Sequence, residues 1–292
     1  MESFAAAVLS WYAHHARDLP WRRPGVGPWA VLVSEVMLQQ TPVARVLPAY
    51  EAWLHRWPEP AALADDPAGD AVRMWGKLGY PRRALRLHEC AGVLVERHGG
   101  AVPSDVDALL ALPGIGAYTA RAVAAFAFGE RHPVVDTNVR RFVARAVLGQ
   151  GEAGPPSTAR DLAAVGELLP IDPARAARFG VAAMEIGAVV CIARTPRCGI
   201  CPVRDCCAWR RAGSPPYAGP SRPTQAFAGT DRQVRGLLLD VLRGCDHPVT
   251  AEQLDRSWPN GIQRARALHG LVADGLIDAL PNGRFALPGQ RA

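Results

Sequence analysis

The sequence predicts an all-α protein with a helical hairpin near its middle, a cysteine-rich loop after the hairpin and a small C-terminal domain. Three observations support this fold class. Apolar residues recur at helical spacing through most of residues 2–190. The turn Pro113-Gly114-Ile115-Gly116 separates two such segments, and five cysteines gather between residues 191 and 207. The strand signal is confined to a hairpin with an Asn-Gly turn at residues 282–283.

Composition limits the classes of function. The chain has 292 residues, enough for two or three modules, and 49% of its residues are hydrophobic. A formal net charge of +6 suits a polyanionic partner. We find no signal-peptide pattern and no apolar run of about 18 residues, so we expect a soluble cytoplasmic protein with no membrane contact. Seven cysteines in that compartment argue against a disulfide framework.

The turn at residues 113–116 has features of an anion-binding site. Pro113 ends the first helix of the hairpin, and the two glycines permit positive φ and close approach of another backbone. Ala117 then begins the second helix, so the amides of Gly114 and Gly116 lie at a helix N-terminus. Such amides favour an anion, for which a DNA phosphate is a candidate. A plain turn between two antiparallel helices is the alternative.

Asp136 occupies the position before the next helical pattern, after the apolar pair Val134-Val135. Capping of that helix would by itself explain an Asp here. A helical hairpin followed by an Asp also resembles the helix-hairpin-helix DNA glycosylases, and the resemblance implies a catalytic role for Asp136.

Glu35 lies in an apolar helical segment that continues to Thr41. A Glu on the solvated face of a helix is the common case. If this side chain is instead partly buried, desolvation raises its pKa and makes it a usable general acid near neutral pH. Gln39, Gln40 and Thr41 form either a solvated helix end or a set of groups that can hydrogen-bond to the edges of bases.

A second turn, Gly79-Tyr80-Pro81, presents an aromatic residue in front of Arg82 and Arg83. An aromatic side chain beside basic residues can wedge between bases while the arginines hold phosphates. The alternative is a turn aromatic that packs on the protein surface.

The cysteine loop gives the strongest local signal. Its spacing is C-x6-C-x2-C-x5-C, from Cys191 through Cys198 and Cys201 to Cys207. Four thiolates this close together suit an iron–sulfur cluster or zinc. The spacing is similar to that of the [4Fe–4S] loop of endonuclease III-like glycosylases, whereas zinc sites more often show paired C-x2-C units. Cys206 is adjacent to Cys207, and an exchange of roles between the two stays open.

The end of the chain has a different character. Residues 211–230 are rich in Pro, Gly and Ser and are predicted to be a linker. Residues 231–292 contain three helical patterns followed by the hairpin, an order that resembles a winged helix-turn-helix domain. Arg264 and Arg266 on the third helix are candidates for DNA contact, and packing or protein contacts are the alternative.

At this point residues 1–210 resemble the adenine DNA glycosylases of the MutY type. The matching motifs are Leu19-Pro20-Trp21-Arg22, the string Ser34–Thr41, Leu78-Gly79-Tyr80, Leu112–Ala120, Asp136-x-Asn138-Val139, Met184-Glu185-Ile186-Gly187-Ala188 and the four-cysteine loop. The resemblance implies an endonuclease III-like fold of two helical modules. Residues 22–145 would form a six-helix barrel domain with the hairpin, and residues 1–21 and 146–210 the [4Fe–4S] cluster domain.

The resemblance also implies a mechanism and a partner. Glu35 would protonate adenine N7, Asp136 would stabilise the oxocarbenium-like sugar or bond to it transiently, and Asn138 and Tyr118 would hydrogen-bond within the site. The partner would be double-stranded DNA with adenine opposite 8-oxoguanine or guanine, bound by a monomer, with the adenine flipped out. The expected DNA-binding residues are Arg22, Gln39, Gln40, Thr41, Tyr80, Arg82, Gly114 and Gly116.

Position 118 separates subfamilies, because endonuclease III-type lyases have a Lys there that forms a Schiff base with the sugar. Tyr118 therefore predicts a monofunctional glycosylase with at most weak strand cleavage. Lys77 is the only lysine of the chain.

Three features depart from the family pattern. Thr137 stands where a Gly is frequent, Pro81 replaces a second Tyr, and the C-terminal region lacks the features of a Nudix-like domain. Two other functions stay open. One is a thymine or uracil mismatch glycosylase of the same superfamily, and the other is a non-catalytic DNA-binding protein with a structural cluster.

Overall fold

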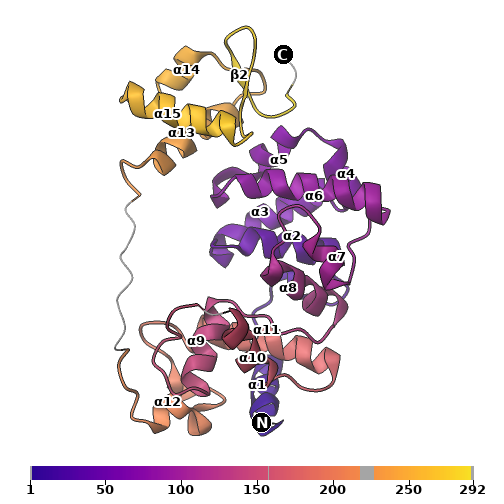
Figure 1. The fold of residues 1–292 in the computed structure, drawn as a ribbon, viewed down its shortest axis with the longest axis vertical. Helices are drawn as coiled ribbons and strands as arrows, with labels where there is room; N and C mark the ends of the chain where they lie inside the picture. Colours follow the sequence, from indigo (N-terminus) through magenta and orange to yellow (C-terminus); the bar gives the residue numbers. More distant parts are fainter. Residues whose placement is uncertain (1, 157, 218–226, 291–292) are drawn as a thin grey trace. The chain divides into compact units, whose positions relative to one another are not determined.

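The computed structural model describes residues 2–156, 158–217 and 227–290, and it confirms the predicted all-α class (Figure 1). Packing divides the chain into two units. Unit 1 comprises residues 1–31, 104–110 and 115–222, and unit 2 comprises residues 32–103, 111–114 and 223–292. Helix α2 (Pro28–Leu38) begins in unit 1 and continues into unit 2. No helix of the described residues combines the length and the apolar character needed to cross a membrane.

Unit 1 is built around α11 (Pro173–Val189), which packs against α1, α8 and α9. Its helices are α1 (Glu2–His15), η1 (Pro20–Arg22), α7 (Val106–Leu110), α8 (Ala117–Phe128), α9 (Thr137–Ala146), α10 (Thr158–Gly166), α11, η3 (Cys198–Ile200), η4 (Arg204–Cys206) and α12 (Ala208–Arg211). The rings of Phe4 and Phe142 stack at 5.9 Å between centroids in a core that also buries Phe179 and Ile186. Burial of these apolar side chains supplies the main stabilisation of the unit.

A fully buried carboxylate fixes the N-terminal segment to α11. Glu185 accepts hydrogen bonds from Arg17 Nε at 2.5 Å and from Arg22 Nη1 at 2.6 Å. Burial acts to raise the pKa of Glu185, but the two guanidinium groups outweigh that effect and hold the pKa below its usual value. Residues far apart in the sequence are therefore joined by charge as well as by apolar contact.

Unit 2 contains the helices that follow α2. They are α3 (Val43–Arg56), α4 (Pro60–Asp65), α5 (Ala68–Trp75), η2 (Gly76–Leu78) and α6 (Arg82–His98). Trp53 lies at the centre of an aromatic cluster, with its ring 4.5 Å from that of Trp57 and 5.6 Å from that of Trp75. All three indoles are almost completely buried. The cluster holds α3 and α5 together beneath the turn that contains Tyr80.

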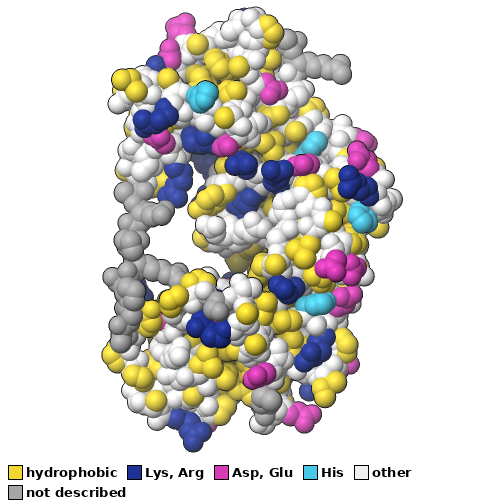
Figure 2. Space-filling model, in the orientation of Figure 1, with side chains coloured by type: hydrophobic (Ala, Val, Ile, Leu, Met, Phe, Trp, Pro, Cys, Tyr) yellow, Lys and Arg dark blue, Asp and Glu magenta, His cyan; other side chains and the backbone are white. Residues whose placement is uncertain are grey.

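The last part of unit 2 has the predicted order of three helices and a hairpin. Its elements are α13 (Asp231–Arg243), α14 (Ala251–Asp255), α15 (Gly261–Ala273), β1 (Asp278–Ala279) and β2 (Phe285–Ala286). The strands are antiparallel, and Val249 forms a further bridge to Phe285. Arg264 pairs with Asp255 and Arg266 with Asp231, so internal ion pairs engage both arginines that the sequence proposed for DNA contact. Figure 2 shows basic and acidic side chains interspersed over this part of the surface.

Direct contacts join this C-terminal part to α5. Arg73 Nη1 donates to the carbonyl of Arg243 at 2.5 Å, and Arg243 Nε donates to the carbonyl of Val72 at 3.0 Å. The amide of Gly69 donates to the carbonyl of Pro288 at 2.7 Å, and a Cβ at Gly69 would lie at the same distance from that oxygen. The absence of a side chain at Gly69 thus permits the close approach.

The predicted linker and the predicted module boundaries differ in how they compare with the structure. Part of the predicted linker, residues 218–226, lies outside the described residues. The sequence grouped helices α8 and α9 with the barrel residues. In the structure both belong to unit 1, because both pack against α11. The module boundaries at residues 22 and 146 stay a prediction.

Candidate functional site

Asp136 is the N-cap of α9, as its sequence position indicated. Its Oδ1 accepts a hydrogen bond of 2.7 Å from the amide of Val139, and its Oδ2 accepts one of 2.8 Å from the side chain of Asn138. Burial raises the pKa of Asp136, and the hydrogen bonds from Val139 and Asn138 and the positive charge of Arg141 offset only part of that rise. The local turn therefore fixes the orientation of a carboxylate that is largely withdrawn from water.

Asn138 links Asp136 to a longer network. The side-chain oxygen of Asn138 accepts a hydrogen bond of 2.8 Å from Arg141 Nη2. Arg141 also donates to the carbonyl of Cys191 at 2.7 Å and to that of Gly187 at 2.6 Å. A continuous series of hydrogen bonds thus connects the Asp136 carboxylate to the backbone at the first cysteine of the loop. Sequence analysis missed Arg141, whose local signal was its position three residues after Asn138.

Gly187 allows α11 to approach the start of α9. A Cβ at Gly187 would lie 2.5 Å from the carbonyl oxygen of Asn138 and 2.9 Å from its Cβ, both shorter than any normal contact. The motif residue Gly187 therefore sets the distance between α11 and the Asp136-Asn138 turn.

Tyr118, on the first turn of α8, is partly buried. Its side chain packs against a small apolar cluster formed by Ala122, Ala125, Val134 and Ala177. The same cluster touches the segment that leads into Asp136, so Tyr118 helps to define the surroundings of the α9 N-terminus.

The four predicted cysteine ligands line one hollow that is partly open to solvent. Cys191 and Cys207 are buried, and Cys198 and Cys201 are partly buried. Cys206 is exposed, and the residues that line the hollow do not include it. The geometry therefore favours Cys207 over its neighbour as the fourth thiol. Among the described residues, no three Cys, His, Asp or Glu side chains converge closely enough to hold a single metal ion.

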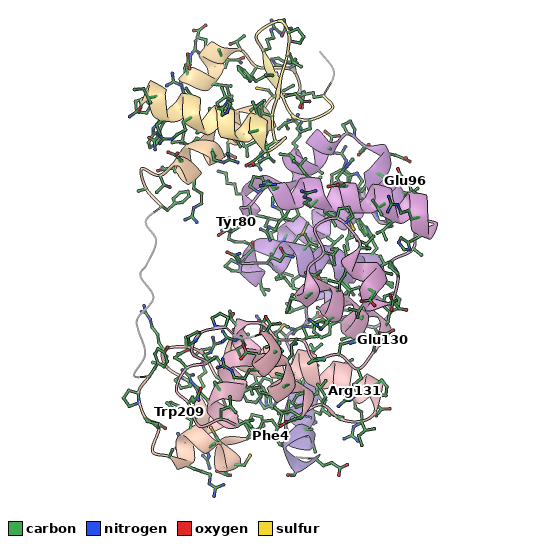
Figure 3. All side chains as sticks on the ribbon, in the orientation of Figure 1. Phe4, Tyr80, Glu96, Glu130, Arg131 and Trp209 are labelled. Carbon is green, nitrogen blue, oxygen red and sulfur yellow. The ribbon has the colours of Figure 1, made fainter. Side chains whose placement is uncertain are left out.

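Arg145 closes one side of this hollow and is 4% exposed. Its Nη1 lies 3.7 Å from Cys191 Sγ and donates to the carbonyl of Ile192 at 2.7 Å. Its guanidinium carbon lies 5.1 Å from the centroid of the Trp209 ring. Figure 3 shows Trp209 in the segment that follows the last cysteine. Arg145 thus places a positive charge beside the thiols, a role that sequence analysis did not anticipate.

Glu35 belongs to unit 2 and lies on α2, where its side chain is 6% exposed. The solvated helix face that the sequence left open is therefore excluded. Ser34 and Val36, on either side of it, are buried as well. The position meets the condition of burial under which the sequence made Glu35 a candidate general acid.

The turns after α2 and before α6 present two exposed side chains. Gln40 has φ +56° and Tyr80 has φ +47°. Tyr80 is 47% exposed and lies at the margin of its unit (Figure 3). Arg82 is exposed and forms an ion pair of 3.4 Å with Asp274. Gln40, Tyr80 and Arg82 are thus on the surface, as a role in DNA binding requires.

Other predicted DNA-binding residues have internal contacts. Arg22, with a side chain 15% exposed, is bound to Glu185. Thr41 is buried, and its hydroxyl donates to the carbonyl of Leu78 at 3.1 Å. Gln39 is half-buried. Arg22 and Thr41 therefore have structural partners of their own.

The hairpin glycines are exposed, and they differ in backbone geometry. Gly114 has φ +77°, and a Cβ there would lie 2.6 Å from Cβ of Arg86. Gly116 is the N-cap of α8 with extended backbone, so positive φ is needed at Gly114 alone. Gly116 thus stands at the start of α8, and the binding of an anion by the turn amides stays a prediction.

Comparison with known proteins places the chain in a family. Residues 33–167 match the HhH-GPD superfamily of base excision DNA repair proteins. The adenine DNA glycosylase of Mycobacterium tuberculosis (strain ATCC 25618 / H37Rv) is 59% identical over 284 residues, which cover 97% of this chain and 93% of the relative. The likeness therefore includes the C-terminal domain. A thymine/uracil-DNA glycosylase of Pyrobaculum aerophilum is 36% identical over 205 residues, covering 69% of this chain and 89% of the relative.

Solved structures agree on the fold. A thermostable thymine-DNA glycosylase aligns with a TM-score of 0.64 and 28% identity over 72% of this chain and 96% of that chain. Endonuclease III, from a non-covalent complex with DNA, aligns with a TM-score of 0.60 and 21% identity over 73% of this chain and 97% of that chain, which shows the fold alone. The chain belongs to the adenine DNA glycosylase family of the HhH-GPD superfamily.

Proposed function

We propose that this protein acts in base excision repair as a glycosylase that hydrolyses adenine from double-stranded DNA in which adenine is mispaired with 8-oxoguanine or guanine. The observation that most supports this function is the Asp136 carboxylate, which is withdrawn from water and oriented by Asn138 and the α9 N-terminus. The adenine DNA glycosylase family, to which the chain belongs, indicates that the nucleobase removed is adenine. We further propose that a monomer acts on nucleoid DNA.

In this proposal the two carboxyl groups have different roles. Glu35 protonates adenine N7 of the flipped nucleotide and so makes the base a better leaving group. Asp136 stabilises the positive charge that develops on the sugar, or bonds to it transiently before water completes hydrolysis. Asn138 keeps the Asp136 carboxylate in place, and Tyr118 shapes the surroundings of the site. Glu35 is buried and Asp136 is partly buried, and reduced access of water would strengthen these electrostatic effects.

The remaining expected DNA contacts divide by their exposure. Tyr80 would wedge into the duplex, Gln40 would contact the base opposite the adenine, and Arg82 and the amides of Gly114 and Gly116 would hold phosphates. Arg22, Gln39 and Thr41 would support these contacts from behind, since they are wholly or partly buried.

Strand cleavage through a Schiff base is not expected. Position 118 is Tyr, and Lys77, the one lysine of the chain, lies in η2 with a side chain that is 85% exposed. Borohydride should therefore trap no covalent complex with DNA.

Cys191, Cys198, Cys201 and Cys207 would hold a [4Fe–4S] cluster. In such a cluster each thiolate binds a different iron, and four thiols around one hollow meet that requirement. The cluster would join the loop to α9 and α12 without taking part in hydrolysis, which involves no electron transfer. Arg145 would donate a hydrogen bond to the Cys191 thiolate, and exposed Arg204 would present positive charge to DNA.

The decisive experiment is single-turnover base release from four duplexes: adenine opposite 8-oxoguanine, guanine or thymine, and thymine opposite guanine. We expect release of adenine from the first two duplexes and none from adenine opposite thymine. Glu35→Gln and Asp136→Asn should bind the same duplexes without turnover. Release of thymine alone would assign the chain to mismatch repair of thymine. Binding without release by the parent protein would make it a non-catalytic DNA-binding protein.

A further inference from the structure

Arg83, the second residue of α6, forms hydrogen bonds with the end of α2. Its Nη1 donates to the carbonyls of Val36 at 2.8 Å, Met37 at 3.1 Å and Gln39 at 2.7 Å. These carbonyls belong to the last turn of α2 and the residues after it, where the helix leaves acceptors without partners of its own. One guanidinium nitrogen thus holds the backbone on the N-terminal side of Gln40.

The other terminal nitrogen of Arg83 has acceptors in both turns. Its Nη2 donates to Gly79 O at 2.9 Å and to Thr41 Oγ1 at 3.0 Å. The guanidinium carbon also lies 5.1 Å from the centroid of the Trp75 ring and 5.6 Å from that of Tyr80. The planar fork of one arginine therefore bridges the turn with Gln40 and the turn with Tyr80.

Both turns have unfavourable backbone conformations next to the carbonyls that Arg83 binds. Three non-glycine residues of the described chain have positive φ, and Gln40 and Tyr80 are two of them. Side chains disfavour this conformation, so it persists only where the surroundings impose it, often at functional sites. The bonds to Gln39 O and Gly79 O immediately precede Gln40 and Tyr80 and supply that constraint.

Burial of Arg83 has a cost. Desolvation lowers its pKa to about 10, and its buried Nε finds no hydrogen-bond partner among the described residues. A half-buried cation with one buried, unsatisfied donor is an unusual choice for stability alone. The cost is consistent with a requirement for the fork geometry at this place.

We propose that Arg83 is the positioning residue that couples the two DNA-reading turns, setting Tyr80 and Gln40 in register so that the enzyme discriminates between bases opposite the adenine. The inference rests on the proposed function, in which Tyr80 and Gln40 contact DNA. Loss of the Arg83 guanidinium group should uncouple the two turns. Discrimination between bases opposite the adenine should then decrease by a larger factor than the rate on the best substrate.

Arg83→Lys tests the proposal, because Lys keeps the charge but cannot reach both turns with a planar fork. Arg97→Lys, an exposed change on the same helix, is the matched control. We expect Arg83→Lys to reduce the ratio of adenine release opposite 8-oxoguanine to that opposite guanine by about tenfold, the effect of losing one charge-assisted hydrogen bond. The single-turnover rate opposite 8-oxoguanine should fall less than this ratio, and Arg97→Lys should match the parent.

A second measurement reports on position instead of activity. In an Asp136→Asn background, 2-aminopurine beside the 8-oxoguanine should gain fluorescence when Tyr80 unstacks the neighbouring bases. Arg83→Lys should reduce that gain at saturating protein, and Tyr80→Ala should reduce it in the parent but little further in Arg83→Lys. Equal discrimination and equal fluorescence for Arg83→Lys and Arg97→Lys would overturn the inference.

Failure of the two proposals can be separated. A parent protein that releases no adenine contradicts the proposed function, whereas an active parent with an unaffected Arg83→Lys variant contradicts the positioning role alone. If Arg83→Lys does not fold, Thr41→Val removes the acceptor of Arg83 Nη2 in the turn that contains Gln40, while Arg83 itself stays. Thr41→Val should then lower discrimination and fluorescence in the same direction, and parent-like values for both would reject the coupling.

Discussion

The side-chain amide of Asn138 donates a hydrogen bond of 2.8 Å to Oδ2 of Asp136. The same bond acts on the pKa of Asp136 against the effect of burial, since it favours the charged carboxylate. Asn138 is itself held by Arg141, so the orientation and the ionisation of Asp136 depend on residues beyond the N-cap turn.

Replacement of Asn138 by Ala should shift the acid limb of the pH–rate profile. In the proposed mechanism Asp136 must be ionised to stabilise a positive sugar, and its pKa is already raised by burial. Without the Asn138 bond that pKa rises further, so activity should be lost at a higher pH than in the parent. At pH 7 we expect a fall in rate of about tenfold or more, the effect of losing a hydrogen bond to a charged group. Single-turnover rates between pH 4 and 9 would test this, and an unchanged acid limb would contradict it.

Asp136→Asn should abolish turnover without loss of stability. Because the folded pKa of Asp136 is raised, the folded state binds the proton more tightly than the unfolded chain, whose Asp has a pKa of about 3.9. The ionised carboxylate therefore lowers stability as pH rises through the folded pKa. Asn keeps the capping function. Thermal melts of both proteins should agree near pH 4, and the variant should melt at a temperature equal to or above the parent at pH 7. A variant that melts well below the parent at pH 7 would contradict the prediction that the ionised Asp136 carboxylate lowers the stability of the folded protein.

Gly187→Ala should damage the site through backbone displacement. The added Cβ would lie 2.5 Å from the Asn138 carbonyl oxygen, so α9 and α11 must move apart. We expect a cost in stability of about 1–3 kcal/mol and a larger loss of activity, because the Asp136-Asn138 turn moves with the backbone. Gly180→Ala, on the same helix and with its nearest contact at 3.5 Å, is the control. Chemical unfolding and single-turnover rates should separate the two variants, and equal behaviour would show that the close approach is not needed.

The two adjacent cysteines should behave differently. Cys207 lines the hollow shared with Cys191, Cys198 and Cys201, and Cys206 is exposed outside it. Cys206→Ser should therefore retain the iron and sulfide content and the visible absorption of a [4Fe–4S] protein. Cys207→Ser should lose most of both. The reverse pattern would move the fourth ligand to Cys206, and a colourless parent loaded with zinc would reject the cluster.

Local features were predictable from the sequence because they depend on neighbours within one or two helical turns. The N-cap of Asp136, the end of the hairpin at Pro113-Gly114 and the order of elements after residue 230 are of this kind. The spacing C-x6-C-x2-C-x5-C ends at Cys207, but the burial of Cys207 and the exposure of Cys206 depend on the packing of the loop and were not predictable from the spacing.

Long-range polar contacts escaped prediction. Arg22 was expected on DNA, but its partner Glu185 is 163 residues away. Thr41 was expected in the same role, and its hydroxyl is bound to a carbonyl 37 residues away. Arg83 was noted only as a basic neighbour of Tyr80, and the sequence did not indicate the backbone carbonyls that Arg83, Arg141 and Arg145 bind.

The sequence by itself determined the helical class, the family and the chemical groups available for the reaction, because periodicity, turn residues and motif spacing are properties of the chain. The tertiary structure alone decided which arginines form hydrogen bonds with the turns at Gln40 and Tyr80, with the Asp136 network and beside the Cys191 thiol. The physical reason is that their acceptors are mainly backbone carbonyls, which every residue has. A guanidinium group finds such acceptors only when folding brings the ends of distant helices to it.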